Sequence, residues 1–144
     1  MKFSHRIGGA VMALAMLGAA GAAIAQDAAP AKAGPLAGNW TGTFVQVGHP
    51  QAYRMAIQFS GKSAEIDYPD QSCGGKLARV GAKDGTSFYV ETITRGGVDP
   101  ATGHGCVGGN VTLIRSGETL IWGWVGEHQG KPIVAYATLT KAAE

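Results

Sequence analysis

The sequence lacks the motifs that mark most enzymes and metal-binding proteins. It has no Gly-x-Ser-x-Gly turn, no His-Glu-x-x-His sequence and no Cys-x-x-Cys pair. Only 15% of its 144 residues are charged, and only two are cysteines. Beyond residue 39 no window keeps the apolar spacing of a helix on which such a motif is usually held. We therefore expect a protein that is not an enzyme and that uses no cofactor and no metal.

Acidic side chains are absent from the first 25 residues. Lys2 and Arg6 precede a long apolar run, which contains four glycines and ends in Ala23-Ile24-Ala25. A basic start, an apolar centre and an Ala-x-Ala site are typical of a secretory signal peptide, here residues 1–25. We predict a periplasmic or secreted protein in an oxidising environment, with no membrane insertion after cleavage.

The mature chain has no excess of positive charge. Cleavage removes Lys2 and Arg6 from the 12 basic side chains, and the remaining ten face ten acidic ones. No stripe of lysine and arginine remains, so we expect no nucleic-acid partner. Residues 26–37 are rich in alanine and proline, which predicts a flexible linker before a single domain at 38–144.

Short runs rich in β-branched and aromatic residues recur in that domain between glycine-containing turns. In the clearest run, Tyr53, Met55, Ile57 and Phe59 fall on one face, as in a half-buried strand. The same pattern predicts eight strands, at about 39–47, 52–60, 64–68, 75–82, 87–94, 107–115, 119–126 and 133–140. We expect an all-β, antiparallel up-and-down meander closed into a small barrel, with a two-sheet sandwich as the alternative.

The predicted connections are of two kinds. Those at 61–63, 83–86 and 116–118 are tight turns, whereas 48–51, 69–74, 95–106 and 127–131 are longer or contain proline. Because successive connections of a meander alternate between its ends, the tight turns should lie at one end and the longer loops at the other. We call the second end the loop end. Both cysteines and all three histidines of the mature chain fall there.

Cys73 and Cys106 are predicted to form a disulfide, because the chain is expected to be exported and has no other cysteine. Such a bridge should stabilise the fold by roughly 3–4 kcal/mol. The alternative, a reactive thiol or a metal pair, lacks a third soft ligand nearby. Glycine pairs at 74/75 and 108/109 are expected to let strands bend or approach closely beside the bridge.

Seven polar residues of the loop end are candidates for a binding site: His49, Asp70, Arg95, Asp99, His104, Glu127 and His128. A zinc or copper site is one interpretation of this set. The residues lie on four separate connections, however, without the short spacing of a metal motif. We favour solvated loop histidines.

Three tryptophans are candidates for a pocket: Trp40, Trp122 and Trp124. Trp122 and Trp124 alternate onto one face of their strand, where in a barrel they would line a pocket for an apolar or sugar ligand. The other interpretation is plain core, since a domain of this size needs large side chains to bury enough apolar area. We favour core packing.

Two resemblances bear on these expectations. The opening at residues 36–42, with Trp40-Thr-Gly42, resembles the Gly-x-Trp start of calycin-type barrels such as lipocalins and avidins, which hold small ligands in an eight-stranded cup. A closer likeness is to a small extracytoplasmic bacterial domain without established activity, which also occurs on the outer part of some serine/threonine kinases. It is carried by Trp40-x-Gly42, Ile66-x-Tyr68-Pro69, Cys73-Gly-Gly-x-Leu77, Phe88 to Ile93, Cys106, Val111-x-Leu113 and Trp122-x-Trp124. This resemblance implies an exported module, with no catalytic residue carried over.

The leading prediction is an exported β-barrel that binds a small molecule, a glycan or a protein through its loop end, its interior being a second candidate site. The alternative is a secreted protein-protein module, such as a protease inhibitor presenting the 95–106 loop. A hollow interior lined by Trp122 and Trp124 would favour the first, and a filled interior with a protruding loop the second. The sequence leaves the ligand and the oligomeric state open.

Overall fold

Alternating inward and outward side chains produce eight strands in the computed structural model, which describes residues 36–61 and 63–143. They are β1 (Gly38–Gln46), β2 (Ala52–Ser60), β3 (Ser63–Tyr68), β4 (Cys73–Lys83), β5 (Thr86–Arg95), β6 (Gly109–Ser116), β7 (Thr119–His128) and β8 (Lys131–Lys141). A 3-10 helix, η1 (Pro69–Gln71), joins β3 to β4. The predicted signal peptide and residues 26–35 of the predicted linker lie outside the described residues.

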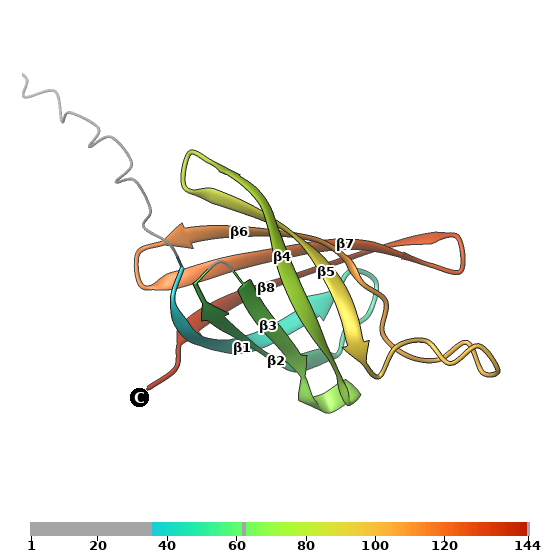
Figure 1. Cartoon of the computed structure of the whole chain (residues 1–144). Helices are drawn as coiled ribbons and strands as arrows, with labels where there is room; N and C mark the ends of the chain where they lie inside the picture. Colours follow the sequence, from blue (N-terminus) through green and yellow to red (C-terminus); the bar gives the residue numbers. More distant parts are fainter. Residues whose placement is uncertain (1–35, 62, 144) are drawn as a thin grey trace, which may run out of the picture.

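Each strand pairs antiparallel with its neighbours, and β8 pairs with β1 to close the barrel (Figure 1). The predicted all-β meander and barrel are confirmed. The alternative of two packed sheets is wrong, because β1 and β8 stay in register from Trp40 opposite Lys141 to Gln46 opposite Ala135. Closure gives each of the eight described strands a neighbour on both sides, so none of them is an edge strand. In the part of the chain that the structure describes, no helix is long and apolar enough to cross a membrane.

The two ends of the barrel differ, as the connections predict, with one correction. The turns after β2, β4 and β6 lie at one end, and the connections after β1, β3, β5 and β7 lie at the other. The expected loop at 127–131 is instead a two-residue turn of Gln129 and Gly130, with φ of 52° and 74°. Positive φ at both positions is what a type I′ hairpin requires. Glu127 and His128 are therefore strand residues.

Apolar side chains fill the half of the barrel next to the tight turns. Met55 and Ile57 of β2 meet leucines from β4, β6, β7 and β8, and all of them are at most 2% exposed. The leucines are Leu77, Leu113, Leu120 and Leu139. Burial of this continuous apolar core supplies the main driving force for folding.

Candidate functional site

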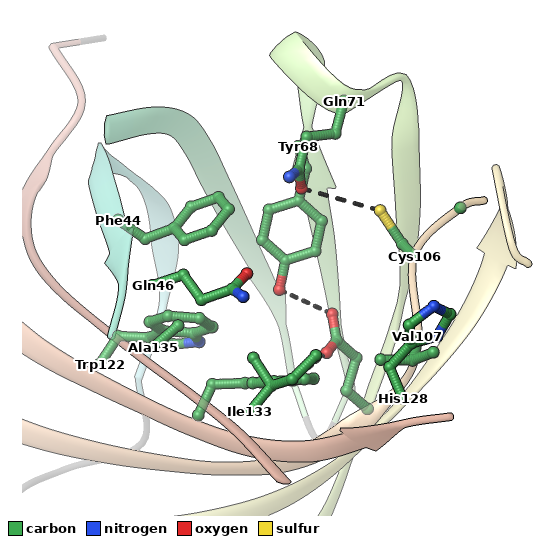
Figure 2. Close-up of a pocket in the computed structure, with 13 residues that line it drawn as sticks. Phe44, Gln46, Tyr68, Gln71, Cys106, Val107, Trp122, His128, Ile133 and Ala135 are labelled. Atoms are coloured by element: carbon green, nitrogen blue, oxygen red, sulfur yellow. Dashed lines mark hydrogen bonds between the residues drawn. The ribbon is translucent and has the colours of Figure 1, made fainter. Parts of the chain in front are cut away.

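The interior is hollow at the loop end, where a cavity of about 240 Å³ opens to solvent (Figure 2). Strand alternation places its walls, because residues two apart on β1, β7 and β8 point to the same side of the sheet. Side chains from β3, β5, η1 and the β5–β6 loop complete it. The lining residues are Phe44, Gln46, Tyr68, Gln71, Glu91, Gly105, Cys106, Val107, Trp122, Trp124, His128, Ile133 and Ala135.

Aromatic rings form the floor of this cavity. The ring centroid of Phe44 lies 5.8 Å from that of Trp122 and 5.3 Å from that of Tyr68. Trp122 is 1% exposed and belongs to the core cluster, yet it also lines the cavity. Trp122 therefore lies at the boundary between the core and the cavity, and both interpretations of it from the sequence, core and pocket, apply.

Glu91 is the one buried charged side chain among the described residues, with 4% of its surface exposed. It lies on β5 and reaches the cavity wall. Its Oε1 accepts a hydrogen bond of 2.8 Å from the Tyr68 hydroxyl, and its Oε2 accepts one of 2.6 Å from Trp124 Nε1. In Figure 2 a dashed line marks the hydrogen bond of the Tyr68 hydroxyl to this carboxyl, and Tyr68 comes from β3, two strands away from β5. Both donors are neutral, so the carboxyl has hydrogen bonds but no counter-ion there.

Burial raises the pKa of Glu91 above its usual range, and this effect exceeds the lowering by the hydrogen bonds from Tyr68 and Trp124. The pKa of the Tyr68 hydroxyl is also raised, first by burial and then by the neighbouring carboxylate charge. The two shifts share their largest cause, namely burial, which disfavours a negative charge on either group.

We expect the stability difference between the wild type and a Glu91→Gln variant to change with pH. The folded protein holds the Glu91 proton more tightly than the unfolded chain, whose glutamate pKa is about 4.3. That stabilisation is complete below the unfolded pKa and is lost as pH rises through the folded pKa. Urea unfolding at a series of pH values should show the wild type losing stability relative to the variant as pH increases. Tyr68 and His128, the other titratable groups of the cavity, are common to both proteins, and a difference independent of pH would contradict the assignment.

Two glycines hold the Trp124 indole in position. A Cβ on Gly109 would lie 2.6 Å from Trp124 Cε2, and one on Gly126 would overlap the far edge of the same ring. Gly109 and Gly126 are paired across β6 and β7, so together they provide the flat surface on which the indole lies. This placement directs Nε1 toward Glu91.

The predicted disulfide between Cys73 and Cys106 is confirmed. It lies at the rim of the cavity, where Cys73 is buried and Cys106 contributes to the lining. The Cys106 backbone N–H also donates to the carbonyl of Gly96, at 2.9 Å. Close backbone approach at the neighbouring glycines is confirmed as well, because a Cβ on Gly75 would overlap the Thr92 carbonyl. The bridge thus fixes the part of the long loop that borders the cavity.

Of the seven polar candidates, the structure brings only His128 to the cavity. Asp70 accepts hydrogen bonds from the Arg54 side chain and backbone, which lower the pKa of Asp70. Arg95 pairs with Asp67 at the end of β5, away from the cavity. The remaining four are exposed: His49, Asp99, His104 and Glu127.

The histidines therefore do not converge, and residues 36–61 and 63–143 contain no group of three or more His, Cys, Asp or Glu side chains placed to hold a metal. Trp40 is also separate from the cavity. It is buried near the start of β1, where its Nε1 donates to the Ala37 carbonyl at 3.2 Å. Trp122 and Trp124 are the two tryptophans that line the cavity.

Glu91 is the acidic residue of this site that sequence reasoning missed. The signal for it was present, since Tyr89, Glu91 and Ile93 alternate onto one face of the predicted strand at 87–94. An acid between two apolar residues on the inner face of a strand is rare unless it has buried partners. Gln46 was also missed, although it follows Phe44 on the inner face of β1 and the same alternation predicts that it points inward.

Comparisons of this chain with protein families, with curated proteins and with solved structures find no match. The two family resemblances therefore stay predictions.

Proposed function

We propose that this chain is an exported, non-enzymatic binding protein that takes a small amphipathic molecule into the cavity at the loop end of its barrel. The observation that carries the proposal is the cavity itself, lined by both Trp122 and Trp124. A volume of about 240 Å³ lies below the roughly 300–1,000 Å³ typical of sites for drug-sized ligands. The ligand should accordingly be of fragment size.

The chemistry of the wall supports binding. Apolar and aromatic side chains cover most of it, and Gln46, Gln71, Glu91 and His128 supply a few polar groups. This combination is typical of small-molecule sites. Trp122 Nε1 is buried without a hydrogen-bond partner among the described residues, and such donors are normally satisfied by protein, water or ligand.

The proposal also includes export of the protein and a lack of catalytic activity. The disulfide fits an oxidising compartment, such as the periplasm or the outside of the cell. Among the described residues that line the cavity there is no serine, threonine or lysine, and both cysteines of the chain are bridged. The wall therefore lacks a serine, threonine, lysine or thiol nucleophile, and we propose that its Glu91, Tyr68 and His128 side chains serve binding.

We expect Ala135→Leu to abolish ligand binding. Ala135 is 4% exposed and lines the cavity, so a larger side chain there fills the space that a ligand needs. Compounds of fragment size are first screened against the wild type by tryptophan fluorescence and calorimetry. The matched control is Val134→Leu, on the same strand but 42% exposed on the outer face, which should leave affinity unchanged. Equal affinity of the wild type and Ala135→Leu would contradict the proposed site.

One observation favours a second function, that of a secreted protein-protein module such as a protease inhibitor. The β5–β6 connection, which contains residues 96–106 of the predicted 95–106 loop, projects away from the barrel (gold in Figure 1). Hydrogen bonds from Asp99 N to His104 O and from Gly103 N to Asp99 O shape its tip, and the disulfide anchors its base. Ala135→Leu separates the two functions, because it blocks the cavity and leaves this loop intact.

A further inference from the structure

We propose that the cavity takes a small organic cation, a protonated or quaternary amine, whose charged group lies between the Glu91 carboxyl and the surrounding aromatic rings. This inference rests on the proposed function and specifies the class of its ligand. It follows from three features of the wall: an uncompensated acid, several aromatic faces and the absence of a basic side chain other than His128 among the described lining residues.

The Glu91 carboxyl has room for a further partner. Each oxygen accepts one hydrogen bond, from Tyr68 or from Trp124, and a carboxylate has about four acceptor sites. The arginines that lie nearest to the loop end, Arg54 and Arg95, are engaged with acids elsewhere. A buried carboxylate without a counter-ion is unfavourable, so a cation that enters the cavity offsets this unfavourable term.

The aromatic floor suits the same ligand. Tryptophan and tyrosine faces attract cations through their quadrupole, and recognition of quaternary ammonium groups uses such rings. Tyr68, Trp122 and Trp124 line the same cavity as Glu91, and Phe44 packs against Tyr68 and Trp122. An anionic ligand is disfavoured at this position, because it would meet the carboxylate in a desolvated wall.

The remaining walls define the rest of the ligand. Val107, Ile133 and Ala135 offer apolar contacts for methyl groups or a short alkyl chain. Gln46, Gln71 and His128 stand around the same cavity and provide polar partners for the other end of the molecule. A compact amine that carries one hydroxyl or amide group meets both requirements.

The test compares cations with their neutral carbon isosteres. Choline is paired with 3,3-dimethylbutan-1-ol, and butylammonium with butan-1-ol of equal length, in calorimetric and fluorescence titrations of the mature protein. The wild type should bind each cation about tenfold more tightly than its neutral partner. Glu91→Gln should lose most of this preference, because only the attraction of the rings remains, and should keep its affinity for the neutral compounds.

Two controls make the result specific. Glu127→Gln removes the same charge from the exposed outer face of β7 and should keep the preference for cations. The Glu91→Gln variant is expected to fold, because a carboxamide oxygen can accept from Trp124 while its NH₂ group donates to the Tyr68 oxygen. Thermal unfolding checks this. If that variant does not fold, the comparison of cation with isostere in the wild type decides alone.

Equal or tighter binding of the neutral isosteres by the wild type would overturn the inference of a cationic ligand and leave the cavity as a binding site. Failure of both series and of the fragment screen would overturn the proposed function as well. Retention of the cation preference in Glu91→Gln would show that the carboxyl is not its source and would also overturn the inference.

Discussion

Replacement of Cys73 and Cys106 together by serine is expected to lower the free energy of unfolding by about 3–4 kcal/mol. The bridge joins positions 33 residues apart, and its loss returns the entropy of that loop to the unfolded chain. Since domains of this size are stable by only about 5–15 kcal/mol, much of the stability should disappear. Urea unfolding at 25 °C measures the change.

The same experiment has an internal control. Reductant should destabilise the wild type by a similar amount and leave the double-serine variant unchanged. Because Cys106 borders the cavity and its backbone anchors the long loop at Gly96, the variant should also bind fragments more weakly. A loss of stability below about 1 kcal/mol, typical of ordinary surface changes, would contradict the role assigned to the bridge.

Trp122→Ala is expected to cost about 3–5 kcal/mol, the range found for large aromatic residues removed from a core. Trp122 is the largest of the fully buried side chains and lies between the core and the cavity. Its removal would join the cavity to the space vacated by the indole, so the walls cannot collapse fully. The free energy of unfolding in urea gives the measure.

Ile121→Ala is the matched control for this substitution. Ile121 is the preceding residue of β7 and is 42% exposed on the outer face, so its truncation should cost less than about 1 kcal/mol. Trp122→Phe should fall between the two, because it keeps an aromatic ring and removes the buried N–H that has no partner among the described residues. Equal effects of Trp122→Ala and Ile121→Ala would refute the boundary role of Trp122.

The fold was predictable because its signals are local. Alternation at Tyr53, Met55, Ile57 and Phe59 indicated the strand that the structure shows at Ala52–Ser60. Turn residues such as Asp84-Gly85 indicated the hairpins. The β7–β8 turn was predicted too long, because pairing extends both strands past the apolar pattern, to His128 opposite Lys131.

The candidate site was predicted less well. Histidines and acids on the connections were predicted as site residues because they are reactive and exposed. Of these, only His128 lines the cavity. Trp122 and Trp124 were found from their alternation. Glu91 was not found, because an acid in a strand usually faces solvent and only its position in the alternation argues otherwise.

By itself, the sequence determined the strands, the meander, the separation of the two barrel ends and the pairing of the only two cysteines. The strands, the meander and the barrel ends follow from neighbours in the chain or from a pattern of period two, and the disulfide follows from the presence of only two cysteines in a chain expected to be exported. The convergence of Tyr68, Glu91 and Trp124 was decided only by the tertiary structure, since β3, β5 and β7 are not adjacent in the sheet. Strand tilt, stagger and side-chain volume decide which inward side chains meet across a barrel. A local sequence pattern predicts none of these three quantities.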